Sequence, residues 1–153
     1  MSPETFASYV RRYCEWAESS THDLKTAHEL LQALIAGAPG LRASIGQARE
    51  RTPLGFPREV VWADTKRYAD FPFQCYYPSH WQEVHPEGNI TENIYEDFAH
   101  IYAELRHGLE EMEKDNTEGA IAYWCDSYFY QWGHHANAAV WAIEEHEKRI
   151  KNG

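Results

Sequence analysis

Two adjacent histidines, His134 and His135, stand in the segment QWGHHANAAVWA at 131–142. Imidazole is both a common metal ligand and a general base near neutral pH. In a helix, however, neighbouring side chains diverge by about 100°, so the two rings do not converge on one ion. With residues placed at that interval, His135 lies near the apolar side and His134 points away from it. We therefore interpret His135 as a buried histidine with a polar partner, and a ligand or catalytic role is the alternative.

The side of this helix that carries His134 also carries three large aromatic residues. These are Tyr123, Tyr130 and Trp141. An aromatic stripe opposite the core-facing side is unusual for a surface helix. Either the helix is buried on both sides or the stripe contacts a partner. Tyr123, Tyr130, His134 and Trp141 are thus candidate interface residues.

A second group with metal-binding residue types occupies one face of the preceding predicted helix. Its members, at spacings of four, four and three, are Glu96, His100, Glu104 and His107. Such side chains bind divalent metals, and Glu104 with His107 forms a Glu-x-x-His step like those of di-iron bundles. The chain has no second step of this kind, and the face lies opposite the apolar stripe. We therefore expect a solvated charged face, with no bound metal and no cofactor.

Other chemistries are disfavoured by the composition. The three cysteines, Cys14, Cys75 and Cys125, are widely separated, so neither a zinc finger nor a disulfide framework is indicated. Neither GxxxxGK nor GxGxxG is present. A net charge of −10 argues against nucleic acid and anionic membranes as partners. No signal peptide and no membrane span are indicated, so we expect a soluble cytoplasmic protein.

The apolar pattern has helical spacing throughout and shows no strand alternation. Ser2 and Pro3 are typical of a helix start, and Thr21 is the expected cap of the second helix. A capping box is expected at Asn89 and Glu92. The predicted helices cover 3–19, 21–37, 39–48, 58–70, 90–114 and 117–150, the last loosened at Gly133. The prediction is an all-α fold, a compact bundle of five to six helices with a long aromatic-rich loop at 71–88, as one domain over 1–153.

The C-terminal half contains a recognisable series of motifs. Tyr76-Tyr77-Pro78 is followed by EDFAHIYAELRHGL at 96–109, and then by Trp132, Gly133, His135 and Ala136. Over roughly 68–143 this pattern resembles an uncharacterised bacterial family called domain of unknown function 5063. The chain departs from the family pattern at three positions. Gln131 replaces a histidine, and Glu96 and His100 each replace an aspartate, whereas Asp97 and His135 are retained.

These observations lead to one principal functional hypothesis and two alternatives. Residues 87–118 carry ten acidic side chains against two basic ones, which favours a non-catalytic protein-binding module, antidote-like or adaptor-like. The first alternative is an enzyme or a small-ligand or metal-binding protein. Its candidate pocket comprises Asp97, Tyr102, Trp132 and His135, with the 71–81 loop beside it. The second alternative is a homodimer through the aromatic face of the last helix.

Overall fold

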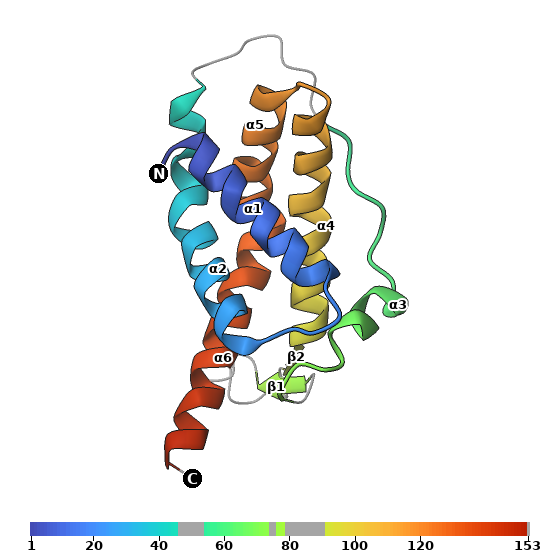
Figure 1. Ribbon diagram of the computed structural model, residues 1–153, viewed down its shortest axis with the longest axis vertical. Helices are drawn as coiled ribbons and strands as arrows, with labels where there is room; N and C mark the ends of the chain where they lie inside the picture. The colour runs from blue at the N-terminus through green and yellow to red at the C-terminus, as the bar shows by residue number, and fades with distance from the viewer. Residues whose placement is uncertain (46–53, 74–75, 79–90, 153) are drawn as a thin grey trace.

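The computed structural model describes residues 1–45, 54–73, 76–78 and 91–152, and it confirms the all-α prediction (Figure 1). Its α-helices are α1 (Pro3–Glu18), α2 (Leu24–Gly37), α3 (Trp62–Thr65), α4 (Ile94–Glu113), α5 (Thr117–Ser127) and α6 (Gly133–Asn152). The 3-10 helices are η1 (Ala38–Ser44) and η2 (Lys66–Tyr68), and η4 (Tyr128–Trp132) is a π-helical turn. Two strands of three residues each, β1 (Tyr76–Pro78) and β2 (Thr91–Asn93), pair antiparallel.

The first two helices begin where capping side chains satisfy free backbone N–H groups. The Ser2 side chain accepts from the Thr5 amide, with Pro3 in the first turn. The second helix is capped by Asp23, which accepts from the Thr26 amide, and not by Thr21 as predicted. Asp23 is two residues closer to the first apolar position, and its carboxylate is a strong acceptor for these amides.

Five helices, α1, α2, α4, α5 and α6, form the body of the molecule. α1 runs diagonally in front of α2 and α4, while α5 lies beside α4 and continues through η4 into α6, whose end extends past the bundle (Figure 1). Every residue of α5 from 119 to 125 is buried, so this helix is covered on all sides. The core is rich in aromatic residues, including the fully buried Trp124 and Trp132. Across the core, the Tyr13 hydroxyl donates to the Phe98 carbonyl at 2.9 Å.

Three local predictions need correction. The expected helix over 58–70 is limited to Trp62–Tyr68, because residues 58–61 are extended and the Asp64 carboxylate accepts from the Val61 amide at 2.8 Å. The helix expected from 90 begins at Ile94, where the Asn93 side chain accepts from the Tyr95 amide. The helix expected over 39–48 is a 3-10 turn over Ala38–Ser44, and its last predicted residues lie outside the described part. Asn89 and most of the 71–88 loop lie outside it as well.

The largest deviation from the predicted regular helix over 117–150 is the π turn. The Gly133 amide donates to the Tyr128 carbonyl, five residues earlier. A Cβ on residue 133 would lie 2.3 Å from that carbonyl oxygen, so only glycine fits at this position. One residue is thereby inserted relative to an α-helix, which shifts the faces of α5 and α6 against each other.

Among the described helices, none is long and apolar enough to cross a membrane.

Candidate functional site

Polar and titratable side chains line the contact between α4 and the α5–η4–α6 segment. We call this set the polar seam. Its members are Asp97, His100, Glu104 and His107 from α4, and Tyr123, Gln131 and His135 from the facing segment. The α4 residues recur at spacings of three, four and three, which places them on one side of that helix. Titratable groups gathered in a protein interior are a marker of functional sites.

The best-defined pair of the polar seam is Asp97 with His135. The Nδ1 atom of His135 lies 2.8 Å from Oδ1 of Asp97, and the two side chains are 17% and 3% exposed. A carboxylate at Nδ1 fixes the ring orientation and keeps that nitrogen protonated. No hydrogen bond to Nε2 of His135 is found among the described residues.

His100 stacks on His135 with almost parallel rings, at a centroid distance of 4.5 Å and an angle of 8°. On its other side, Nδ1 of His100 lies 3.3 Å from Nε2 of Gln131. Burial, with a contribution from the neighbouring His135, lowers the pKa of His100 to about 4. His100 is therefore neutral near pH 7.

The prediction that this face of α4 is solvated is wrong for Glu104. Glu104 is buried and accepts a hydrogen bond from the Tyr123 hydroxyl. Glu96 is exposed as predicted, while His100 and His107 are half-buried. The helical spacing of these residues showed which of them share a face. It did not show that α5 and η4 pack over that face, because helix pairing is decided by the tertiary fold. No three His, Cys, Asp or Glu side chains form a metal-binding group in the described ranges.

We expect Glu104 to make stability depend on pH. Burial raises the pKa of its carboxyl above the ordinary value of 4.5, although the Tyr123 hydrogen bond opposes the shift. A raised pKa in the folded state favours folding below that ordinary value, and the contribution is lost as pH rises through the raised pKa. Glu104→Gln resembles the neutral carboxyl and still accepts from Tyr123. Urea denaturation from pH 4 to pH 8 is expected to show a smaller loss of stability in the variant than in the wild type.

The control for this prediction is Glu96→Gln, which removes a charge from an exposed position of the same helix. It is expected to follow the wild-type profile. If the stability of Glu104→Gln changed with pH in parallel with that of the wild type, ionisation of the Glu104 carboxyl would not lower the free energy of unfolding.

The four candidate interface residues do not form one exposed stripe. Tyr123 is only 6% exposed and belongs to the polar seam, so it is excluded as a surface contact residue. His134 and Tyr130 are exposed, whereas Trp141 is half-buried. The prediction of this stripe placed residues at intervals of about 100°, as in an uninterrupted α-helix. The π turn interrupts this helix, so the stripe is not continuous. Residues 119–125 of α5 are buried, so the alternative of burial on both sides holds for that part of the helix.

The four candidate pocket residues are also distributed differently from the prediction. Asp97 and His135 are paired, but Trp132 is fully buried and its indole N–H donates to the Trp124 carbonyl at 3.0 Å. Tyr102 lies on another side of α4, where its hydroxyl donates to Glu18 at 2.6 Å. It lines a separate pocket of about 420 Å³.

Several residues around these sites were not singled out by the sequence reasoning. Arg58 and Arg67 belong to the helix predicted over 58–70, and Phe56 lies just before it. Only Trp62–Tyr68 is helical, so a regular helical face could not place these residues. Phe129 directly precedes Tyr130 and would be on a different face of a regular helix. Their one shared signal is chemical, since bulky aromatic and arginine side chains recur at binding surfaces.

Comparisons with known proteins agree with the resemblance described above. Residues 73–148 match the model of a family described as Domain of unknown function (DUF5063), which confirms that resemblance for the C-terminal part of the chain. No curated protein and no solved structure is significantly similar to the chain. Two of the departures from the family pattern, His100 and Gln131, contact each other.

Proposed function

We propose that this protein is a non-catalytic protein-binding module that holds a basic protein through an exposed aromatic surface. This surface consists of Phe56, Phe129 and Tyr130, which are 83%, 69% and 54% exposed. The observation that carries the proposal is the contact between Phe56 and Tyr130, which come from two distant segments. Phe129 directly precedes Tyr130 and contacts Tyr128. Phe56 and Tyr130 lie 6.5 Å apart, ring centre to ring centre, in an edge-to-face arrangement.

The aromatic surface has a rigid base. The π turn presents two consecutive aromatic residues, Phe129 and Tyr130, to solvent. Tyr130 is hydrogen-bonded to Tyr123, which in turn donates to the buried Glu104. Large rings fixed in this way lose little conformational entropy when a partner binds, which is a property of interface anchors.

The exposed acidic residues at the end of α4 and the start of α5 favour a basic partner. The Gly55 carbonyl lies 2.5 Å from Nε2 of His107, so Phe56 is held beside the C-terminal half of α4. From there to the start of α5 the chain carries an excess of exposed or half-buried acidic residues: Glu110, Glu111, Glu113, Asp115 and Glu118. An acidic rim accelerates and selects encounters with a basic protein, while the aromatic contacts supply most of the affinity.

The test is a double substitution, Phe56→Ser with Phe129→Ser, which leaves the polar seam intact. Basic proteins captured by the wild type from native-host extract are purified, and their one-to-one binding is measured by calorimetry. We expect the double variant to weaken this binding at least about tenfold, because truncating central anchors costs roughly 1–2 kcal/mol or more. Salt of about 0.5 M is expected to slow association, since it screens exposed charges.

The matched control is Ile150→Ser, which removes an equally exposed apolar side chain from the far end of α6. It is expected to bind as the wild type does. If no purified partner distinguishes the double variant from this control, the proposed function is rejected. If light scattering shows a dimer that the double variant dissociates, the occupant of the surface is a second copy of the chain, and the basic-partner proposal is replaced.

A further inference from the structure

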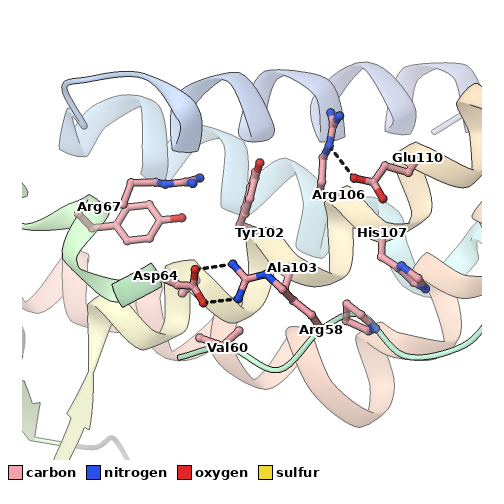
Figure 2. A pocket seen from close by; sticks show the side chains of 12 residues that line it. Arg58, Val60, Asp64, Arg67, Tyr102, Ala103, Arg106, His107 and Glu110 are labelled. Atoms are coloured by element: carbon pink, nitrogen blue, oxygen red, sulfur yellow. Dashed lines mark hydrogen bonds and ion pairs between the residues drawn. The ribbon is translucent and has the colours of Figure 1, made fainter. Parts of the chain in front are cut away.

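An arginine-lined pocket opens on the side of α4 that faces the extended segment 57–61. It has a volume of about 420 Å³, which is in the range of small-molecule sites. Figure 2 shows its charged side chains, which come from three parts of the chain. Arg58 comes from the extended segment, Arg67 from η2, and Arg106 with His107 from α4. This gathers three of the chain's fourteen basic residues in a protein of net charge −10.

The three guanidinium groups differ in how they are neutralised. Arg58 forms a bidentate ion pair with Asp64: Nη2 donates to Oδ1 at 2.6 Å and Nη1 donates to Oδ2 at 3.1 Å. Arg106 donates to Glu110 at 3.3 Å. Arg67, in contrast, has no carboxylate within ion-pair distance in the part of the chain that the structure describes. Its guanidinium carbon lies 4.9 Å from the centre of the Tyr102 ring.

Tyr102 holds Arg67 at the pocket. Its hydroxyl donates to Glu18 of α1, which fixes the ring, and the ring face attracts the guanidinium above it. The Tyr102 hydroxyl also accepts a hydrogen bond from the Arg67 guanidinium. A guanidinium has five N–H donors, so further donors remain. Arg67 is therefore positioned to donate to an oxyanion from outside the chain.

The lining also includes the carboxylates of Asp64 and Glu110, which pair with Arg58 and Arg106, and the side chains of Tyr68 and Tyr102. The pocket has an apolar part as well. Its wall carries Pro57 and Val60, and its floor is the part of α4 with Ala99 and Ala103. These two alanines are one helical turn apart, and longer side chains at either position would occupy the space. The pocket thus combines a small apolar floor with an arginine edge.

We propose that this pocket binds a small organic oxyanion, whose apolar body rests on the alanine floor while its carboxylate or phosphate contacts Arg67. Arginine matches both groups through paired N–H donors. The strongly acidic remainder of the chain does not attract anions, so selectivity comes from this local arrangement. Phe56 of the aromatic surface directly precedes Pro57 of the pocket wall, but the proposed anion site does not depend on the proposed partner.

Three small molecules that each contain one benzene ring test the proposal: phenyl phosphate, benzoate and the neutral benzyl alcohol. Titration into the full chain is followed by amide chemical shifts and by calorimetry. We expect saturable binding of at least one anion below about 10 mM, and at least about tenfold weaker binding of the alcohol. A preference for phenyl phosphate or for benzoate identifies the anionic group that the site selects.

Two variants locate the site, and one serves as control. Arg67→Gln removes the guanidinium that forms no ion pair with a described carboxylate, and it is expected to weaken anion binding at least about tenfold. Ala103→Leu fills the floor without changing charge and is expected to abolish binding. Arg149→Gln removes an exposed arginine of α6 and is expected to leave binding unchanged. The proposal is overturned if neither anion saturates, if the alcohol binds equally well, or if Arg67→Gln binds as the wild type does.

Discussion

Replacing Asp97 by alanine is expected to lower the free energy of unfolding by about 3 kcal/mol, because breaking a buried polar pair leaves its partner unsatisfied. The carboxylate is almost fully buried and lies 2.8 Å from Nδ1 of His135. It links α4 to α6 near the start of both helices. Urea denaturation at pH 7, with the slope compared between variants, measures the change.

A double-mutant cycle separates the pair from the individual residues. His135→Ala is expected to cost about 1–3 kcal/mol by stranding the Asp97 carboxylate. The variant with both substitutions is expected to lose less than the sum of the two single losses, because neither partner is then left alone. His134→Ala is the control. His134 is exposed on the same helix, so its loss is expected to stay within about 0.5 kcal/mol.

Strict additivity in this cycle would show that Asp97 and His135 do not interact energetically. Equal and negligible losses for His134→Ala and His135→Ala would contradict the inward orientation of His135.

Replacing Gly108 by alanine is expected to lower the free energy of unfolding by about 2–3 kcal/mol through overpacking. A Cβ at this position would lie 2.2 Å from Nε1 of Trp124. That indole is fully buried, and its N–H donates to the Leu105 carbonyl at 3.0 Å, so it cannot retract without losing the bond. The substitution therefore forces α4 and α5 apart, at the level where His107 and Tyr123 meet in the polar seam.

Gly40→Ala is the control for Gly108→Ala, because no atom lies within 4 Å of a Cβ built at residue 40. Thermal unfolding of the two variants measures the difference. A Gly108→Ala variant as stable as Gly40→Ala would show that α4 and α5 tolerate a wider separation than their packing indicates.

The extended segment 54–61 contributes to the polar seam, to the aromatic surface and to the arginine-lined pocket. The Gly55 carbonyl contacts His107 of the polar seam, Phe56 completes the aromatic surface, and Arg58 closes one edge of the arginine-lined pocket. This segment carries no regular structure of its own. Its position is maintained by side-chain contacts with α4 and Asp64, and segments of this kind commonly carry function on a rigid scaffold.

Local chemistry in the sequence determined the fold class and most of the long helices. Ser2 with Pro3 marks the start of α1, and the apolar positions from Ile94 to Leu109 follow helical spacing through α4. The resemblance of the C-terminal half to the DUF5063 family was also recognisable, because its residues are spaced along helices that the chain does form. Such signals depend on neighbours within a few turns, which a sequence displays directly.

Only the tertiary structure decided which faces are buried and which residues meet. Glu104 and Tyr123 lie nineteen positions apart and were expected on surfaces, yet they are buried against each other, because α5 packs over that side of α4. The π turn depends on the Gly133 amide reaching the Tyr128 carbonyl, and it changes the face of every residue after it. Arg67 and Arg106 become neighbours only when η2 packs beside α4. Contacts of this kind depend on how helices are placed in space, which the spacing within one helix does not specify.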